Sequence, residues 1–260
     1  MMKNILRSAI AVLLVIVLVS WGYEGHRAVA EIGENHLTPT AKQAVKKLLL
    51  GGTMADAANF ADDIRSTDQY RFTAPFHYLN VPLGYDFAQF STYVKNNPMP
   101  NIYNAMVACI KDLQDPNKTS MQKTFDLKLL IHFIGDAHQP MHVSREEDKG
   151  GNKIIVRYFG QNTDLHGLWD EGMFYQKKLV AKDIVAMCND ATPEQIKKWQ
   201  SDDVMVWLWE SYQVTTILYQ EAASDPNFNE KYYQDHLPIL KNRIEKAGIR
   251  LAGVLNDIYR

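Results

Sequence analysis

Apolar residues recur at helical spacing along most of the chain beyond residue 20, and this periodicity predicts a mainly helical protein. The strongest segment is 121–137, where Phe125, Leu129 and Phe133 repeat every four positions. Thr-Pro pairs are typical of helix starts, whereas Gly-Gly pairs and proline mark helix ends. With these signals the expected helices are residues 21–35, 38–50, 121–137, a segment opened by Thr192-Pro193, 204–223 and 238–259.

Signals for β-structure are few. Residues 154–159 are rich in β-formers, and Gly160-Gln161-Asn162 is a turn signal, so a small hairpin is expected there. Short extended pieces are expected around His77 and within 153–165. Because no repeat or Pro/Gly-rich linker divides the chain, the fold class is interpreted as mainly α, a single helical domain over residues 21–260 with a small β-hairpin.

The first twenty residues have the pattern of a signal peptide. Lys3 and Arg7 precede the apolar run 9–19, and Ser20 is a small residue at a plausible cleavage point. The run is short for a membrane span, although an uncleaved anchor is the alternative. We therefore expect a mature protein over 21–260 that is secreted or periplasmic, with no stable membrane association after cleavage.

Composition narrows the function classes. Hydrophobic residues make up 46% of the chain, enough for a substantial core. The net charge of −2 becomes −4 without Lys3 and Arg7, which argues against binding nucleic acid through surface charge alone. The only cysteines are Cys109 and Cys188, and their spacing leaves open whether they pair or stay free.

Histidines and aspartates form the most informative pattern. His132 and Asp136 are four residues apart within an expected helix, so they share one face, and His166 and Asp170 repeat the spacing. Zinc prefers imidazole nitrogen and carboxylate oxygen. One such pair alone is more typical of a surface contact, but His132 and Asp136 are embedded in an apolar helix, where an unpartnered carboxylate is costly.

These residues occur within motifs that span nearly all of 21–260. In order, the motifs are Trp21-Gly22-x-x-Gly25-His26, Ala61-Asp62-Asp63-Ile64-Arg65, His77-Tyr78, the block from His132 to His142, Gly150-Gly151-Asn152 and Leu165-His166-x-x-Trp169-Asp170. The chain resembles the zinc-dependent, single-strand-specific type I nucleases of fungi, plants and bacteria, which also have 3′-nucleotidase activity. The resemblance implies an endonuclease acting on single-stranded DNA and RNA or on 3′-nucleotides.

The resemblance also implies a cofactor of three Zn²⁺. One ion would be held by Asp62, His77, His132 and Asp136. A second, set apart, would be held by His142, His166 and Asp170. The third would be held by the α-amino nitrogen and carbonyl oxygen of Trp21, with His26 and the bridging Asp136. Because an α-amine binds metal only as a free terminus, this third site requires cleavage after Ser20.

Three zinc ions and three aspartates would leave a local charge of about +3, which reconciles an acidic protein with a polyanionic substrate. Asp62 and Asp136 would act in catalysis by holding a metal-bridging hydroxide that attacks phosphorus and leaves 5′-phosphorylated products. Arg65 is a candidate for binding a phosphate oxygen. A structural ion pair of Arg65 with Asp62 or Asp63 is an equal alternative.

Three residues are candidates for substrate contacts. Tyr78, beside His77, could stack on an unpaired base, unless it is a core aromatic. Asn80 is placed to bond a base edge, but fungal members have aspartate there, so base preference does not carry over. Asn152 could contact substrate, although a Gly-Gly-Asn turn explains it equally well.

The remaining histidines and tryptophans are not expected to bind metal or substrate. His138 is expected beside the ligands or facing solvent, and His36 and His236 are expected to be ordinary surface residues. The helical tryptophans are expected in the core; they are Trp199, Trp207 and Trp209.

Two other functions are alternatives. A zinc-dependent phospholipase C shares an N-terminal tryptophan, but two features oppose it: His166 follows His142 by 24 residues, and Asp170 stands in place of glutamate. A non-catalytic zinc-binding envelope protein would keep the ligands and need no open coordination position. A monomer is expected. DNA versus RNA preference is left open.

Overall fold

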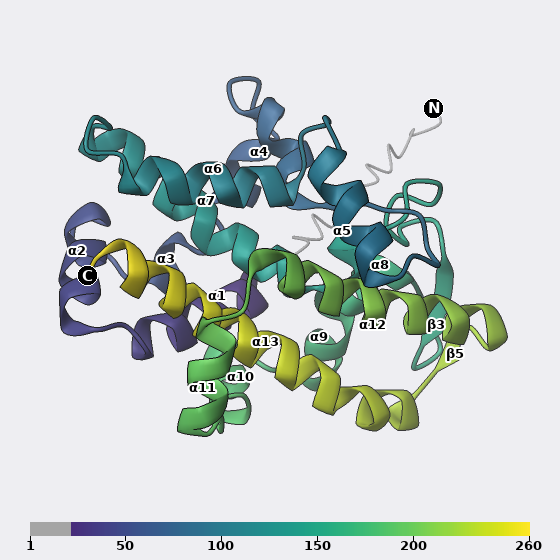
Figure 1. Cartoon of the computed structure of the whole chain (residues 1–260). Helices are drawn as coiled ribbons and strands as arrows, with labels where there is room; N and C mark the ends of the chain where they lie inside the picture. The colour runs from purple at the N-terminus through teal and green to yellow at the C-terminus, as the bar shows by residue number, and fades with distance from the viewer. Residues whose placement is uncertain (1–21) are drawn as a thin grey trace, which may run out of the picture.

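The structure is a computed structural model that describes residues 22–260, and it confirms the mainly helical fold. Figure 1 shows the helices packed around α7, with the long α12 and α13 crossing in front of it. The signal-peptide prediction and Trp21 lie outside the described residues. No helix within 22–260 has the length and apolar character needed to cross a membrane.

The first described elements are four helices, of which the second and third have side-chain caps at their starts. Thr38 accepts a hydrogen bond from the amide of Ala41, which fixes the start of the second helix as the Thr-Pro signal predicts. Gly51, with φ 92°, follows the end of that helix. The elements are α1 (Gly22–Asn35), α2 (Pro39–Leu48), α3 (Met54–Ala57) and α4 (Phe60–Arg65).

The sequence predicted an extended piece around His77. In the structure His77 ends a 3₁₀ helix, and the chain becomes extended at Tyr78. Two short strands then pair in parallel and bring the segment after His77 beside the segment after His142. The elements of this central part are η1 (Arg71–His77), β1 (Leu79–Asn80), α5 (Phe87–Asn96), α6 (Ile102–Gln114), α7 (Ser120–His138), η2 (Pro140–His142) and β2 (Val143–Ser144).

Helix α7 is the central element of the fold. Thr119 and Gln122 form a capping box at its start, and it ends just before Pro140, as predicted. Every residue from 129 to 138 is buried, because α6, α1, α12 and α13 pack around this half of the helix. A helix that is buried on all sides places its polar residues inside the core, where they need partners.

The expected hairpin is confirmed as β3 (Ile155–Tyr158) and β4 (Gln161–Asp164), with β5 (Asn227–Phe228) pairing parallel to β3. The turn is Phe159-Gly160, both with positive φ, so Gln161 and Asn162 belong to the strand and not to the turn.

The C-terminal half is again helical, and the helices predicted after Thr192-Pro193 and over 204–223 are confirmed. Its elements are α8 (Leu165–Gly167), the π-helical turn η3 (Leu168–Gly172), α9 (Met173–Lys177), α10 (Ala181–Met187), α11 (Pro193–Gln200), α12 (Val204–Ser224) and α13 (Glu230–Ile258).

The last helix was predicted to begin at Pro238, but it begins eight residues earlier. The side chain of Asn229 caps it, and Pro238 lies inside it. Proline there removes one helical hydrogen bond. The rings of Tyr232 and His236 stack on each other and Phe228 stacks on Tyr232, so burial of this aromatic column outweighs that loss.

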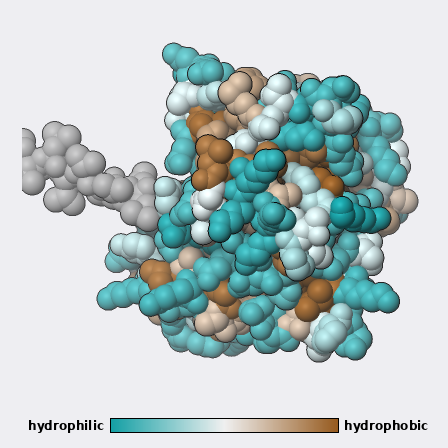
Figure 2. Space-filling model, turned by 90° about the vertical axis from the view of Figure 1, so that its left-hand side faces the viewer, coloured by the Kyte–Doolittle hydropathy of each residue, from teal (hydrophilic) through white to brown (hydrophobic). Residues whose placement is uncertain are grey.

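Helices α1 and α13 approach closely at Gly248, where an added Cβ would lie 2.5 Å from the side chain of Ile32. The two cysteines, Cys109 and Cys188, are free and buried, which settles the question the sequence left open. On the face shown in Figure 2, hydrophilic residues dominate and hydrophobic residues form small separate patches.

Candidate metal centre and substrate cleft

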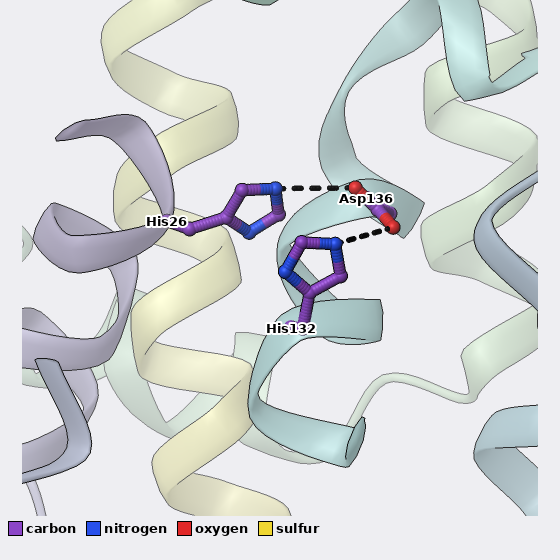
Figure 3. Close-up of side chains that lie close together, drawn as sticks. All are labelled: His26, His132 and Asp136. Atoms are coloured by element: carbon purple, nitrogen blue, oxygen red, sulfur yellow. Dashed lines mark ion pairs between the residues drawn. The ribbon is translucent and has the colours of Figure 1, made fainter. Parts of the chain in front are cut away.

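The site is built on one turn of α7. His132 and Asp136 lie four residues apart and are both fully buried, with Nε2 of His132 3.1 Å from Oδ2 of Asp136. The i, i+4 spacing therefore places imidazole and carboxylate on one face, as the sequence predicted. Figure 3 shows both side chains with His26, which reaches the same carboxylate from α1.

His26 fits against α7 because position 135 is glycine. A Cβ on Gly135 would lie 2.4 Å from Nδ1 of His26, so any larger residue would displace the imidazole. In this space the ring of His26 stacks on that of His132 at 3.9 Å, and its Nε2 lies 3.1 Å from Oδ1 of Asp136. Asp136 thus presents one oxygen to His26 and the other to His132.

Two further elements bring candidate ligands to the same carboxylate. His77, at the end of η1, places Nδ1 2.9 Å from Oδ2 of Asp136 and 3.1 Å from Nε2 of His132. Asp62, on α4, places Oδ1 3.6 Å from the facing nitrogens of both histidines. These residues form two overlapping groups able to hold a metal ion, His26 with His132 and Asp136, and Asp62 with His77 and His132.

A third group able to hold a metal lies beside them and consists of His142, His166 and Asp170. Nε2 of His142 is 3.5 Å from Oδ1 of Asp170, and the rings of His142 and His166 lie 4.9 Å apart. Gln139 donates a hydrogen bond to Oδ1 of Asp170 and orients that carboxylate. This group is linked to the others through His142, whose Nδ1 lies 3.5 Å from Oδ1 of Asp136.

Backbone carbonyls orient three of the histidines. Nδ1 of His132, His142 and His166 donates to the carbonyl oxygens of Ala58, His77 and Gly150, respectively. Donation from Nδ1 leaves the lone pair on Nε2, the nitrogen that faces the neighbouring ligands. Three imidazoles are therefore held in the tautomer that binds a cation.

Burial and charge strongly perturb the protonation of the cluster. Burial lowers the pKa of His77 to about 4, against the opposing effect of Asp136. Burial alone would raise the pKa of Asp136, but His132 and His142 outweigh it and hold that pKa well below its ordinary range. Burial likewise opposes protonation of His142, yet Asp136 and Asp170 raise its pKa to about 9. The buried carboxylates therefore require positive charge beside them.

Several buried nitrogens in the cluster have no hydrogen-bond partner among the described residues: Nδ1 of His26, Nε2 of His77 and Nε2 of His142. A buried polar atom without a partner costs roughly 1–3 kcal/mol, so each such atom needs an explanation. A cation bound between Nε2 of His142 and Asp170 would account for one of them. The donor set of imidazoles and carboxylates matches the preference of zinc.

Two of the three candidate metal groups open into a cavity of about 840 Å³, which is lined in part by His77, His142 and His166. The residues predicted to contact substrate also line it: Arg65, Tyr78, Asn80 and Asn152. Tyr78 is 41% exposed, so it is not a core aromatic. Arg65 forms the alternative ion pair, with Nε 3.1 Å from Oδ1 of Asp62, while still lining the cavity. Asn152 donates to the carbonyl of Lys149, within the expected turn.

The other histidines do not join the metal groups. His138 is buried and not solvent-facing, and its Nε2 lies 3.0 Å from Nη1 of Arg250. His36 lies 3.3 Å from Asn189. The surface interpretation of His236 is wrong, because α13 begins earlier than predicted and its packed face includes this residue. The tryptophans expected in the core are buried or partly buried.

Sequence reasoning missed the residues that support the site. Gln139 was not singled out, although it directly follows the helix that carries Asp136. Asp148 was also missed; it is buried and accepts hydrogen bonds from Arg145, Gly151 and Tyr219. A carboxylate two residues before a Gly-Gly pair was the available signal. The ninth predicted ligand, Trp21, lies outside the described residues.

Fold and site together define a mainly helical enzyme with clustered His/Asp groups that could bind metal ions. The sequence profile of the S1/P1 Nuclease family matches residues 21–260. The chain belongs to this family, and it is therefore a hydrolase of phosphodiester bonds that acts on nucleic acid.

Individual relatives agree with this assignment. The chain is 30% identical to Endonuclease 4 of Arabidopsis thaliana, over 92% of this chain and 89% of that protein. It is 27% identical to Nuclease S1 of Aspergillus oryzae, over 92% and 91%. It is 24% identical to Nuclease P1 of Penicillium citrinum, over 92% and 98%. The match favours a nuclease over the phospholipase C alternative.

Proposed function

We propose that this protein is a zinc-dependent endonuclease that hydrolyses single-stranded DNA and RNA to 5′-phosphorylated products and also removes 3′-phosphates from nucleotides. Three Zn²⁺ would be its cofactors. The proposal is supported by the nuclease family and by the donor chemistry of the buried His/Asp groups. It is further supported by the unpartnered Nε2 of His142, which a cation held together with Asp170 would satisfy.

The residues would divide among the ions as follows. Asp62, His77, His132 and Asp136 would hold the first, and His142, His166 and Asp170 the second. Trp21, His26 and Asp136 would hold the third. The bridging role of Asp136 is supported by its two oxygens, of which Oδ1 faces His26 and Oδ2 faces His77 and His132.

When bound, zinc would polarise the phosphoryl group and lower the pKa of water toward about 7, so that a nucleophile is available near neutrality. Asp62 and Asp136 fix the ligand geometry, and Arg65 would bind a nonbridging phosphate oxygen in exchange for its contact with Asp62. Cleavage of the bond between phosphorus and O3′ leaves the phosphate on the 5′ side of the product.

Preference for single strands would follow from the side chains at the cavity. Tyr78 would stack on an unpaired base, and Asn80 would bond to that base's edge. Asn152 would contact the sugar-phosphate backbone. In a duplex the bases are stacked and paired, so docking on Tyr78 would require unpairing first.

We further propose that residues 1–20 are a signal peptide, that the mature domain is 21–260 and that the protein acts as a secreted or periplasmic monomer. Cleavage after Ser20 would free the α-amine of Trp21. That position lies directly before α1, the helix that carries His26.

The observation that carries the proposal is that two of the three candidate metal-binding groups reach, through His77, His142 and His166, a cavity that exposes Tyr78. The test is to assay protein beginning at Trp21 on single-stranded and duplex DNA of one sequence, with zinc and with a chelator. We expect chelator-sensitive cleavage with a clear preference for the single strand. Equal turnover of both substrates would contradict the proposed role of the cavity, and chelator-resistant turnover would contradict the metal mechanism.

A further inference from the structure

The loop between β2 and β3 presents two lysines to the cavity. Lys149 and Lys153 are both exposed, and both line the same space as His142, His166 and Tyr78. Among residues 22–260 neither ammonium takes part in a salt bridge, and Nζ of Lys153 donates only to the neutral carbonyl oxygen of Glu147. Two cationic groups beside a nuclease centre are thus available to an anion.

A buried carboxylate anchors this loop. Asp148 is 5% exposed and accepts hydrogen bonds from the amide of Gly151, the hydroxyl of Tyr219 and the guanidinium of Arg145. The guanidinium of Arg145 also lies 4.2 Å from the centre of the Tyr219 ring. The carbonyl oxygen of Asp148 accepts from the amide of Lys153. Lys149 and Lys153 are therefore attached to the rigid body of the protein at both ends of the turn.

The same loop is packed directly on the metal-binding residues. Gly150 and Gly151 allow the loop to approach Met141 closely. A Cβ on Gly150 would lie 2.9 Å from the carbonyl oxygen of Met141, and a Cβ on Gly151 would lie 2.5 Å from the Met141 side chain. The carbonyl oxygen of Gly150 accepts from Nδ1 of His166. Lys149 directly precedes Gly150, so its backbone is fixed next to the His142, His166 and Asp170 group.

Charge and size indicate what this rim would bind. Apart from its histidines and Tyr78, the ionisable side chains of the lining are Lys149, Lys153 and Arg65, opposed by the single carboxylate of Glu146, so the lining has a net positive charge in an otherwise acidic protein. The cavity of about 840 Å³ lies toward the upper end of the roughly 300–1000 Å³ of ordinary small-molecule pockets.

We propose that Lys149 and Lys153 form a phosphate subsite that binds the backbone of a single strand beyond the bond being hydrolysed. The inference rests on the proposed function and adds to it a preference for oligonucleotides over substrates with one phosphate. Lysine suits this role because it binds phosphate as a flexible point charge without reading sequence.

The test compares wild type with Lys149→Ala/Lys153→Ala on thymidylyl-thymidine, which has one phosphate, and on an oligothymidylate of about 12 nucleotides. We expect the ratio of kcat/KM on the longer substrate to that on the dinucleotide to fall about tenfold in the variant. Because each phosphate contact on a single strand adds roughly 0.7 to the slope of log affinity against log salt, that slope should decrease by about 1.4.

Lys149→Arg/Lys153→Arg should restore the ratio, since this double variant keeps both charges. Lys111→Ala, on the exposed face of α6, is the matched control for removing a surface lysine. A wild-type ratio and salt slope in the double alanine variant would overturn the subsite. Binding of a phosphorothioate oligothymidylate, measured by fluorescence anisotropy, separates the two proposals. Lysine-dependent binding of this analogue, together with no turnover of the unmodified oligothymidylate, would refute the nuclease mechanism and leave the subsite standing. Binding that does not depend on either lysine would refute the subsite.

Discussion

Nε2 of His26 lies 3.1 Å from Oδ1 of Asp136, which links α1 to the C-terminal end of α7 across the core. The other oxygen of Asp136 faces His77 and His132. One buried carboxylate is therefore common to ligands from three elements of the fold. This sharing explains why the groups that could hold metal ions overlap instead of forming separate sites.

Loss of the Asp136 carboxylate is predicted to abolish most activity. In Asp136→Ala or His132→Ala, turnover of single-stranded DNA should fall more than about 100-fold, because removing a ligand costs more than the 10- to 100-fold typical of its supporting partners. The melting temperature should fall as well, since metal binding is coupled to folding. Kinetics and calorimetry with excess zinc measure both.

Asp235→Asn, at an exposed position on α13, is the control for removing an aspartate without touching the cluster. Wild-type turnover in either the Asp136 or the His132 variant would show that the cluster is not the catalytic centre.

The anchoring role of Asp148 predicts coupling to Tyr219. Asp148→Asn and Tyr219→Phe each disturb the same hydrogen bond, so their effects on the free energy of unfolding should not add. We expect a coupling of about 1 kcal/mol from urea unfolding of the two single variants and the double variant. KM for single-stranded DNA should rise in Asp148→Asn more than kcat falls, because the carboxylate holds the loop and touches no reacting atom. Strictly additive effects on the free energy of unfolding would contradict an energetic coupling between Asp148 and Tyr219.

The start of the mature chain is predicted to matter for metal content. A protein with one alanine inserted before Trp21 lacks a free α-amine at that residue and should bind one zinc fewer than protein beginning at Trp21. Native mass spectrometry measures the number directly. Equal zinc content in the two proteins would remove Trp21 from the ligand set.

Glu210 should make stability depend on pH. Burial opposes its ionisation, but hydrogen bonds and charges from Arg250 and Arg243 lower its pKa to about 2. Because the folded pKa lies below the ordinary value of 4.5, this stabilisation is complete above about pH 4.5 and is lost as the pH falls toward 2. Glu210→Gln should therefore destabilise the protein by about 3 kcal/mol at pH 7.

Urea unfolding at pH 7 and at successively lower pH tests the direction of this pH dependence. The difference in the free energy of unfolding between wild type and Glu210→Gln should become smaller below pH 4.5. A difference that widened on acidification would mean that the arginines do not hold Glu210 ionised.

The sequence was sufficient to predict the helical fold and the convergence of His132 and Asp136, because a four-residue spacing in a helix fixes two side chains on one face. The pairing of His26 with Asp136 came only from the family resemblance, because the contact depends on the space that Gly135 leaves opposite α1. Such a space is a property of two packed helices and is absent from either segment alone. Local rules therefore singled out His132 and Asp136, the resemblance supplied the other candidate ligands, and tertiary packing determines how they meet.

The same distinction explains the errors. Pro238 was interpreted as a helix start, but the aromatic column of Tyr232 and His236 extends α13 through it, and burial outweighs a local signal. His236 was assigned to the surface because it has no metal-binding neighbours, but it lies in the part of α13 that precedes Pro238 and is buried there. Asp148 was missed because its third partner, Tyr219, is 71 residues away in the sequence, although Arg145 and Gly151 are near it.

The central claim is that three zinc ions, held by this cluster, are required for hydrolysis of single-stranded nucleic acid. It is tested most directly by removing metal from protein beginning at Trp21, restoring zinc in steps, and measuring bound zinc and single-strand turnover in the same samples. The account predicts no turnover without metal and full turnover at three zinc ions per chain. Full turnover by zinc-free protein, or saturation at one bound ion, would contradict it.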